Sequence, residues 1–321
     1  MKVLIIGGAG FFGYHLSKKY ISLGKTVHIV DDLSRGKLDE DLSEILDCGQ
    51  ISLYNEDLYS FYKNKNYSKE YDLIYHFAAK VGVANVQNDP YGTLYNNINL
   101  TNIAVNIARE QKSLKRMIFT STSEVYSGAV EINIANIPTI ENTALIINNI
   151  KEERATYKLS KIVGESMLLN SNLPVSIVRP HNIYGPRMGM AHVIPELIFK
   201  ISQLKDGGAL GVYSMNHTRT FCYIEDAINM IMQIATSKNT LNKILNLGAE
   251  SPEIKMCNLA KKIIKLTKKK LDIVADIDHP GSPIRRCPDM SETLKNINYS
   301  YQVDLESGLS KTFNWYIKHL Y

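Results

Sequence analysis

Residues 3–13 read Val3-Leu4-Ile5-Ile6-Gly7-Gly8-Ala9-Gly10-Phe11-Phe12-Gly13, an apolar run that leads directly into a glycine-rich turn. Residues 14–23 then carry a helical pattern. A strand, a tight glycine turn and a helix N-terminus together form a site for a dinucleotide pyrophosphate. We therefore expect a dinucleotide cofactor to contact Gly7, Gly10, Phe11, Phe12 and Gly13.

A second motif, Tyr157-Lys158-Leu159-Ser160-Lys161, follows about 150 residues later. The spacing of four places Tyr157 and Lys161 on one face of a helix. An ammonium group there can lower the pKa of the phenol, because it favours the phenolate. The two motifs together predict hydride transfer to or from a bound nicotinamide, with Tyr157 as the proton-transfer group.

The composition is that of an ordinary globular protein with a large core, at 321 residues, 45% apolar and 21% charged. The net charge of +5 is small and no basic stripe alternates with aromatic residues, so we expect no nucleic-acid or membrane partner. No apolar run approaches the roughly 20 residues that span a bilayer. The four cysteines are scattered without a CxxC spacing, which predicts no metal site and a cytoplasmic location.

Strand-like and helical patterns alternate along the chain. The strand-like runs cover residues 3–6, 27–30, 73–77, 116–120, 175–178 and 244–247. The helical patterns cover residues 13–23, 90–111, 157–171, 192–204, 224–236 and 256–268. This alternation predicts an α/β fold of the Rossmann type, a doubly wound parallel sheet with helices on both faces.

The pattern changes after Arg179, where turns become frequent. We expect residues 1–178 and 221–247 to form the NAD-binding Rossmann domain. Residues 179–220 and 248–321 then form a second, smaller mixed α/β lobe that binds the substrate. Ligands of open α/β sheets bind beyond the C-terminal ends of the strands, so the cleft between the two parts is the expected site.

Two acidic residues, Asp31 and Asp32, follow the run at 27–30. A carboxylate at the end of the second strand can accept a hydrogen bond from a ribose 2′-OH and repels a 2′-phosphate, which favours NAD over NADP. Arg35 is close to this position. Both a solvated loop arginine and a phosphate contact remain open for it.

The segment Thr120-Ser121-Thr122-Ser123-Glu124-Val125-Tyr126 comes at the end of the run at 116–120. Hydroxyl and carboxylate groups at the C-terminal end of a parallel strand face the expected cleft. The alternative is a hydrogen-bonded turn in which Glu124 caps a helix. With Tyr157 and Lys161, the segment completes a triad of a hydroxyl that orients a substrate alcohol, a phenol and a lysine.

With these residues in place, the chain resembles the extended short-chain dehydrogenases/reductases of the nucleotide-sugar epimerase/dehydratase family. The resemblance covers almost the whole length. It rests on the glycine turn, Asp31, Asp57-Leu58, His76-Phe77-Ala78-Ala79, the 121–126 segment, the Tyr157–Lys161 pair, Arg179-Pro180-His181-Asn182-Ile183-Tyr184-Gly185-Pro186, Thr218-Arg219-Thr220-Phe221 and Arg285-Arg286-Cys287-Pro288-Asp289.

This resemblance implies an enzyme that keeps NAD bound throughout turnover, takes a nucleotide-diphosphate sugar and forms a homodimer through two helices of each subunit. It further implies that Asp57 and Leu58 lie at the adenine and that Ala78 and Ala79 lie beside the cofactor. The residues implied to grip the diphosphate and the nucleoside are Asn182, Arg219 and Arg286. A guanidinium suits that role because it binds phosphate oxygens bidentately.

The catalytic set implied by the resemblance is Thr122, Ser123, Glu124, Tyr157 and Lys161. Simple 4-epimerases of the family usually lack an acid at the position of Glu124, and the deoxythymidine-sugar 4,6-dehydratases have aspartate at that of Ser123. Thr-Ser-Glu resembles the UDP-glucuronate decarboxylases and the GDP-mannose 4,6-dehydratases, and Arg-Arg-x-Pro-Asp leans toward the decarboxylases. We therefore rank decarboxylation of a UDP-hexuronate such as UDP-glucuronate first, then 4,6-dehydration, then 4-epimerisation. A non-catalytic NAD-binding protein is the alternative outside the enzymes.

Overall fold

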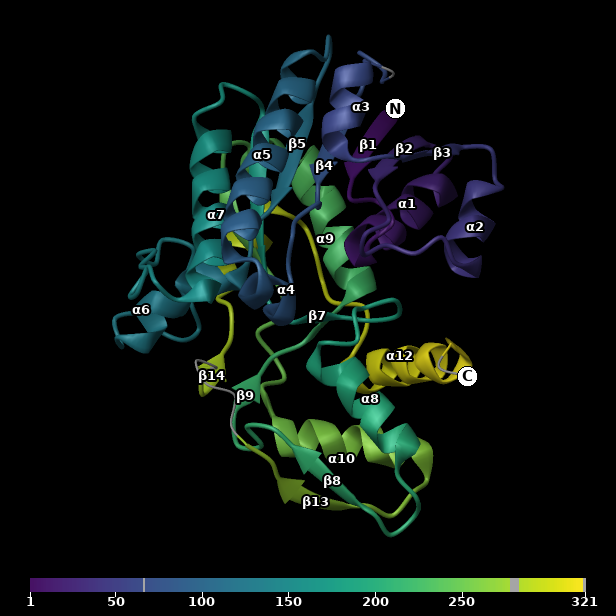
Figure 1. Cartoon of the computed structure of the whole chain (residues 1–321), viewed down its shortest axis with the longest axis vertical. Helices are drawn as coiled ribbons and strands as arrows, with labels where there is room; N and C mark the ends of the chain where they lie inside the picture. The colour runs from purple at the N-terminus through teal and green to yellow at the C-terminus, as the bar shows by residue number, and fades with distance from the viewer. Residues whose placement is uncertain (66, 278–282, 320–321) are drawn as a thin grey trace.

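The computed structural model describes residues 1–65, 67–277 and 283–319 (Figure 1). Its centre is a seven-stranded parallel sheet with the strand order β11-β6-β5-β4-β1-β2-β3. The strands are β1 (Lys2–Ile6), β2 (Thr26–Asp31), β3 (Ile51–Asn55), β4 (Leu73–His76), β5 (Arg116–Thr120), β6 (Val175–Pro180) and β11 (Ile244–Leu247). Since β1 lies between β2 and β4, the strand order reverses directly beside the glycine turn. This arrangement confirms the predicted Rossmann-type α/β fold.

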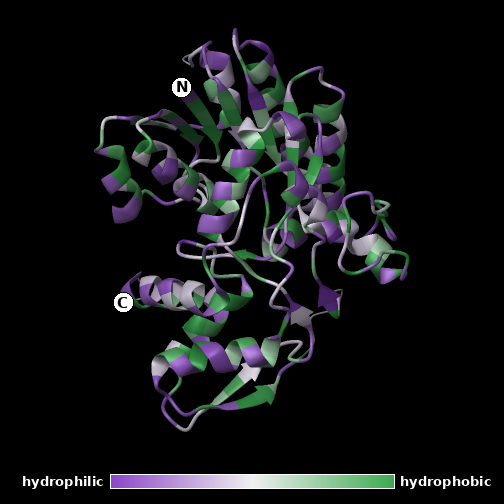
Figure 2. Ribbon diagram, turned by 180° about the vertical axis from the view of Figure 1, so that it is seen from behind, coloured by the Kyte–Doolittle hydropathy of each residue, from purple (hydrophilic) through white to green (hydrophobic). Residues whose placement is uncertain are grey.

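Helices cover both faces of the sheet. One face carries α1 (Phe11–Ser22), α2 (Glu40–Leu46) and α9 (Ile224–Thr236). The other carries α3 (Leu58–Asn64), α5 (Pro90–Arg109) and α7 (Glu153–Leu169). In β1, Val3 and Ile5 pack toward α1 and α9, whereas Leu4 and Ile6 pack toward α3 and α5. Because both faces are buried, the strands are mostly hydrophobic along their whole length (Figure 2), as expected for a parallel sheet.

The sequence predicted six of the seven strands of the main sheet and missed the edge strand β3. The bounds of β5, β11 and α9 agree with their predicted residues. Strand β3 was missed, because it reads Ile-Ser-Leu-Tyr-Asn and only Ile51 in it is buried. The prediction that a helix covers residues 157–171 was wrong at both ends, since α7 starts at Glu153 and ends at Leu169.

The chain after β6 builds the lower part of the molecule in Figure 1. Three small sheets pair β10 with β7, β12 and β14 with β9, and β13 with β8. Their strands are β7 (Ile183–Tyr184), β8 (Ala209–Val212), β9 (Thr218–Arg219), β10 (Cys222–Tyr223), β12 (Ile254–Lys255), β13 (Asp272–Ala275) and β14 (Arg285–Arg286). The helices of this part are α8 (Val193–Gln203), α10 (Met256–Thr267) and α12 (Leu305–His319). Helix α11 (Ser291–Asn296) packs instead against β11 of the main sheet. Residues 224–247 return α9 and β11 to the main sheet.

Shorter elements complete the fold. They are α4 (Val83–Asn88), α6 (Ser127–Glu131) and the 3-10 helices η1 (Ser123–Tyr126) and η2 (Lys238–Thr240). Among the described residues, no helix is both long and apolar enough to cross a membrane.

Candidate active site

Three positions of the turn after β1 are occupied by glycine, each for a different structural reason. Gly7 has a φ of +81°, and a Cβ there would lie 2.6 Å from the backbone nitrogen of Ala78. A Cβ on Gly13 would lie 2.4 Å from the Cα of Gly8, so this glycine lets α1 pack onto the turn. Within 4 Å, a Cβ on Gly10 would meet only the Gly7 carbonyl oxygen, at 3.4 Å, among the described residues. The turn thus leaves space before the N-terminus of α1, where a pyrophosphate can approach the helix amides.

Asp31 closes β2 beside this turn. Its Oδ2 accepts a hydrogen bond from Ala9 N at 3.0 Å, and its Oδ1 accepts one from Leu33 N at 2.9 Å. Burial raises the pKa of Asp31, although these two backbone hydrogen bonds oppose the shift. Each oxygen keeps a second lone pair for a ribose hydroxyl. Asp32 is exposed, and its Oδ1 accepts hydrogen bonds from the backbone and the hydroxyl of Ser34, so the structure shows it stabilising the loop.

The two residues expected at the adenine have visible structural tasks. Asp57 caps α3, because its Oδ1 accepts hydrogen bonds from Tyr59 N at 2.9 Å and Ser60 N at 3.0 Å. The side chain of Leu58 is buried in the core. Ala78 N donates to the carbonyl of Ile6, which places Ala78 at the C-terminal end of β1, and Ala79 follows it. These residues lie at the same edge of the sheet as the glycine turn, and their contacts with a cofactor stay predictions.

Helix α7 places Tyr157 beside Thr122 and Lys161 beneath strand β5. Burial raises the pKa of Tyr157, and the nearby charge of Glu124 raises it further, while a hydrogen bond with Thr122 and the charge of Arg35 lower it. Lys161 donates to the Thr120 carbonyl at 2.7 Å. Burial lowers the pKa of Lys161 to about 8, against an opposing effect of Glu165. The expectation that the Lys161 ammonium lowers the pKa of Tyr157 stays a prediction, since the groups seen to lower it here are Thr122 and Arg35.

Glu124 forms an ion pair that its sequence motif does not predict. Thr122 caps η1 by accepting a hydrogen bond from Glu124 N at 3.2 Å, so Thr122 is the cap and the alternative of a capping Glu124 side chain was wrong. The Glu124 carboxylate accepts instead from Arg154 Nη2, at 3.2 Å for Oε1 and 3.1 Å for Oε2. Arg154 lies on α7 one turn before Tyr157. A helix predicted to begin at Glu153, four residues earlier, would have placed Arg154 on the same helix as Tyr157.

Arg286 brings another positive charge to the same place. It lies on β14, where its charge is close enough to Glu124 and Arg154 for both to affect its pKa. Burial lowers the pKa of Arg286, and Glu124 opposes that shift. Ser123 and Arg286 also line one pocket, together with Thr139, His181 and Arg285 among others. Contacts and charges thus connect Glu124 with Arg154, Tyr157 and Arg286. Arg286 also shares a pocket with Ser123.

The other two residues expected to bind substrate have backbone partners. The Arg219 guanidinium donates to the carbonyls of Thr218 at 2.7 Å, Pro283 at 2.7 Å and Ile284 at 3.2 Å. Burial and the charge of Arg286 lower the pKa of Arg219 to about 10. Arg219 thus ties β9 to the residues before β14, and its contact with a substrate diphosphate stays a prediction. Asn182 Nδ2 donates to the Thr220 carbonyl at 2.9 Å.

A buried polar network connects α7, η1 and β11, the elements next to Glu124 and Tyr157. The Arg179 guanidinium pairs with Glu165 of α7 through Nε at 2.8 Å and Nη2 at 2.6 Å. Its Nη1 donates to the Tyr126 hydroxyl at 2.9 Å, and that hydroxyl donates to Asn246 Oδ1 at 2.9 Å. This network fixes η1 relative to α7 and β11, so it holds Glu124 and Tyr157 in a constant relation. The sequence places Arg179 in the 179–186 motif but does not reveal its partner Glu165.

No group of three or more His, Cys, Asp or Glu side chains that could hold a metal ion occurs among residues 1–65, 67–277 and 283–319. All four cysteines are free thiols. Free thiols are compatible with a reducing compartment, and the cytoplasmic location stays a prediction.

Comparisons with known proteins agree with this geometry. The sequence model of the NAD dependent epimerase/dehydratase family matches residues 3–248. The chain is 30% identical to a UDP-N-acetyl-alpha-D-glucosaminuronate decarboxylase of Bacillus cytotoxicus, over 98% of this chain and 97% of that protein. It is 30% identical to UDP-glucuronic acid decarboxylase 1 of Xenopus tropicalis, over 99% of this chain and 73% of that protein. The solved UDP-glucose 4-epimerase of Thermotoga maritima shares its fold at a TM-score of 0.85 and 22% identity, with both chains fully covered.

Proposed function

The chain belongs to the NAD-dependent epimerase/dehydratase family, and from this premise we propose that it is a UDP-hexuronate decarboxylase with UDP-glucuronate as its first candidate substrate. The observation that carries the proposal is the pairing of Glu124 with Arg154 beside Tyr157, close to the charge of Arg286. A cleft with two arginines and one glutamate suits a substrate that carries a diphosphate and a sugar carboxylate. Two relatives that are 30% identical are named UDP-N-acetyl-alpha-D-glucosaminuronate decarboxylase and UDP-glucuronic acid decarboxylase 1.

The residues of the site fit NAD. The glycine turn leaves room at the N-terminus of α1, and the Asp31 carboxylate lies beside it with a free lone pair on each oxygen. Gly7, Gly10, Phe11, Phe12 and Gly13 would hold the pyrophosphate, and Asp31 the adenosine ribose. When bound, NAD accepts a hydride from the sugar C4 and returns one later in the cycle.

The chain's own groups carry the proton chemistry. The Tyr157 phenolate removes the proton of the sugar 4-OH, and Thr122, to which Tyr157 is hydrogen bonded, orients that hydroxyl. Lys161, fixed on the Thr120 carbonyl, places a positive charge beneath the cofactor cleft. Oxidation at C4 turns a 5-carboxylate into a β-keto acid. The bond between C5 and C6 then breaks and carbon dioxide leaves. The electron pair of the broken bond stays on the sugar as an enolate, whose oxygen the protonated Tyr157 can stabilise.

Glu124 and Arg154 act after the oxidation. Once carbon dioxide has left, C5 needs a proton, and a carboxyl group or a water molecule held by it can supply one. Arg154 orients the Glu124 carboxylate through contacts to both oxygens. A 4,6-dehydratase is the second candidate, because the same Glu124 could remove a C5 proton when C6 carries a hydroxyl. A 4-epimerase needs no acid or base at C5. Epimerisation is therefore the third candidate, because it gives Glu124 no role.

A product assay decides among these reactions. Purified protein is incubated with UDP-glucuronate and UDP-N-acetylglucosaminuronate labelled with ¹³C at C6, and in parallel with UDP-glucose, dTDP-glucose and GDP-mannose. We expect labelled carbon dioxide and a UDP-pentose from a uronate, both detected by NMR. A 4-keto-6-deoxy sugar would establish the dehydratase, and a C4 epimer with the label retained would establish the epimerase. Either result would refute decarboxylation.

Arg286 should hold the substrate diphosphate. We expect Arg286→Ala to weaken UDP binding by about 1.5–3 kcal/mol, the usual contribution of a hydrogen bond to a charged group. Isothermal titration of UDP measures the effect. The matched control is Arg109→Ala, because Arg109 is an exposed arginine in the last turn of α5 and does not line the pocket of Arg286. Equal UDP affinities in the two variants would contradict the role of Arg286.

We also propose a homodimer through α5 and α7, which pack side by side (Figure 1). Two tyrosines of α5, Tyr91 and Tyr95, stack with ring centroids 6.1 Å apart and stay 77% and 57% exposed in the single chain. A second copy on this face would bury them. We expect a dimer mass in light scattering that falls toward the monomer in Tyr91→Asp/Tyr95→Asp. A monomeric parent protein would refute the dimer.

A further inference from the structure

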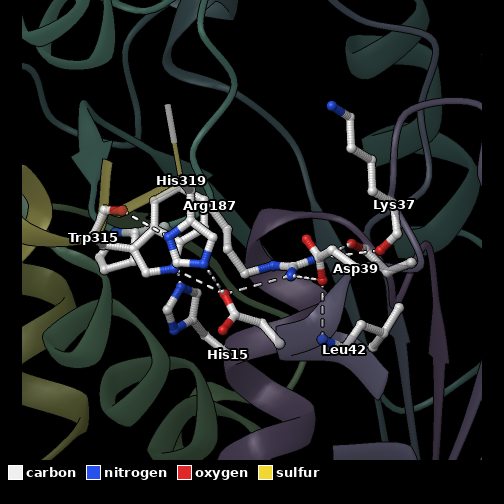
Figure 3. A network of polar contacts seen from close by, with 10 residues as sticks. His15, Lys37, Asp39, Leu42, Arg187, Trp315 and His319 are labelled. Carbon is white, nitrogen blue, oxygen red and sulfur yellow. Dashed lines mark hydrogen bonds and ion pairs between the residues drawn. The ribbon is translucent and has the colours of Figure 1, made fainter. Parts of the chain in front are cut away.

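A group of polar and aromatic side chains connects the loop after β2 to the segment between β7 and α8 and to helix α12 (Figure 3). We call it the latch, and it consists of Asp39, Asp41, Arg187, Trp315 and His319. Asp39 and Asp41 come from the loop after β2 and the start of α2, Arg187 from the segment between β7 and α8, and the two rings from α12. None of these residues belongs to the chemistry described above.

The loop that the latch holds, residues 32–39, lies directly on the glycine turn. A Cβ on Gly36 would come within 2.6 Å of the Ala9 Cβ and 3.0 Å of its carbonyl carbon. From the strand side, Asp31 accepts the hydrogen bond of Ala9 N. Any displacement of this loop therefore changes the surroundings of the pyrophosphate turn and of the predicted ribose ligand.

Arg187 binds the far end of that loop. Its Nη1 donates to Asp39 Oδ1 and lies 3.8 Å from Asp41 Oδ2, and its guanidinium stands 4.3 Å from the centre of the Tyr14 ring on α1. The Arg187 side chain is only 6% exposed. Burial alone would raise the pKa of Asp39, but Arg187 outweighs it and holds that pKa below its ordinary value. The ion pair is therefore formed in a place where water screens it little.

Helix α12 braces the acidic side of the latch. Trp315 Nε1 donates to Asp41 Oδ2 at 2.8 Å. The His319 ring stacks on the Trp315 ring, with centroids 4.2 Å apart, and its Nε2 lies 3.8 Å from the same Asp41 oxygen. Tyr316, which follows Trp315 in α12, donates a hydrogen bond from its hydroxyl to the carbonyl of Met188, the residue after Arg187. The C-terminal helix thus fixes both sides of the ion pair.

We propose that this latch keeps the 32–39 loop closed on the glycine turn and so sets how slowly NAD leaves the protein, with Arg187 as its positioning residue. A reaction that oxidises and then reduces the same sugar needs the same cofactor molecule to stay in place between the two steps. Opening of the loop separates Asp39 from Arg187, whose charge then lacks its partner in a buried position. Release of the cofactor is therefore slow while the latch is intact.

The test compares NADH release in variants of the full protein. The variants are Asp39→Asn, which keeps the shape of a half-exposed side chain, Arg187→Gln, and the conservative Arg187→Lys. Lys311→Gln is the matched control, because it breaks another ion pair of α12, the exposed contact with Glu225 at 3.2 Å. Bound NADH is chased with excess NAD, and its fluorescence decay gives the dissociation rate. The NAD content after gel filtration and the melting temperature are recorded for each variant.

We expect Asp39→Asn and Arg187→Gln to release NADH at least about tenfold faster and to emerge with less bound NAD, with Arg187→Lys in between and Lys311→Gln unchanged. If Arg187→Gln does not fold, Asp39→Asn decides. A lower melting temperature with an unchanged release rate would show that the ion pair only stabilises the fold, and the proposal would be wrong. The same holds if Lys311→Gln speeds release as much as Asp39→Asn. Failure of the product assay would leave this test unaffected, because NADH release is measured without a sugar.

Discussion

Tyr157→Phe should fold and bind NAD, yet lose turnover by about 10²–10⁴-fold, the usual contribution of a positioned acid–base group. The substitution removes only the hydroxyl that exchanges a proton with the sugar 4-OH. The phenyl ring stays in the same position on α7. Turnover of a labelled UDP-uronate, measured at saturating NAD, gives the loss, and the NAD content of the purified variant shows whether binding is intact.

The control for this prediction is Tyr301→Phe. The Tyr301 hydroxyl donates to the Gly248 carbonyl at 2.8 Å, so its removal costs one hydrogen bond without touching the catalytic group. We expect this variant to turn over normally. Near-normal turnover in Tyr157→Phe itself would contradict the acid–base role and return the chain to the alternative of a protein that only holds NAD.

The fold was largely predictable because its signals are local and repeated. A parallel sheet buried on both faces needs strands with apolar runs such as residues 3–6 and 117–119, and the glycine turn needs a positive φ at Gly7. The edge strand β3 lacks this signal, since burial of one face at the margin of the sheet requires few apolar residues.

The site was predictable in its parts more than in its contacts. Short motifs indicate which residues reach the cleft, and they correctly brought Thr122 and Tyr157 together. They do not reveal which charges meet across it. Arg154 pairs with Glu124 from 30 positions away, and Arg219 turns its guanidinium to backbone carbonyls of residues 283–284. Such pairings depend on helix starts and backbone paths, which spacing alone does not fix.

The hydrogen-bond partner of Lys161 is another contact that residue spacing alone does not predict. A spacing of four residues correctly places it on the face of α7 that carries Tyr157, but its ammonium donates to the Thr120 carbonyl. The groups that shift the pKa of the Tyr157 phenol include Glu124, which raises it, and Thr122 and Arg35, which lower it. Glu124 therefore influences the first step of the reaction through its charge, besides the role proposed for it after C4 oxidation.

Glu124→Gln is expected to separate these two effects. The amide keeps the shape of the side chain but has no proton to exchange and no charge. C4 oxidation should persist, seen as NADH absorbance when substrate is added, whereas release of carbon dioxide and completion of the cycle should fall by about 10²–10⁴-fold. The matched control is Glu131→Gln, since Glu131 is an exposed acid that accepts a hydrogen bond from Asn148 at 2.8 Å.

The pH dependence of the oxidation adds a second readout for the same variant. A negative charge near a phenol disfavours the phenolate, so Glu124 raises the pKa of Tyr157 and its removal must lower that pKa. The rate of C4 oxidation increases as Tyr157 loses its proton, so its alkaline rise should move to lower pH in Glu124→Gln and stay in place in Glu131→Gln. If Glu124→Gln instead interconverts C4 epimers at the parent rate, without carbon dioxide and with an unmoved pH profile, then the carboxylate serves only to hold Arg154. The cleft would then be that of an epimerase, because only epimerisation leaves C5 untouched throughout.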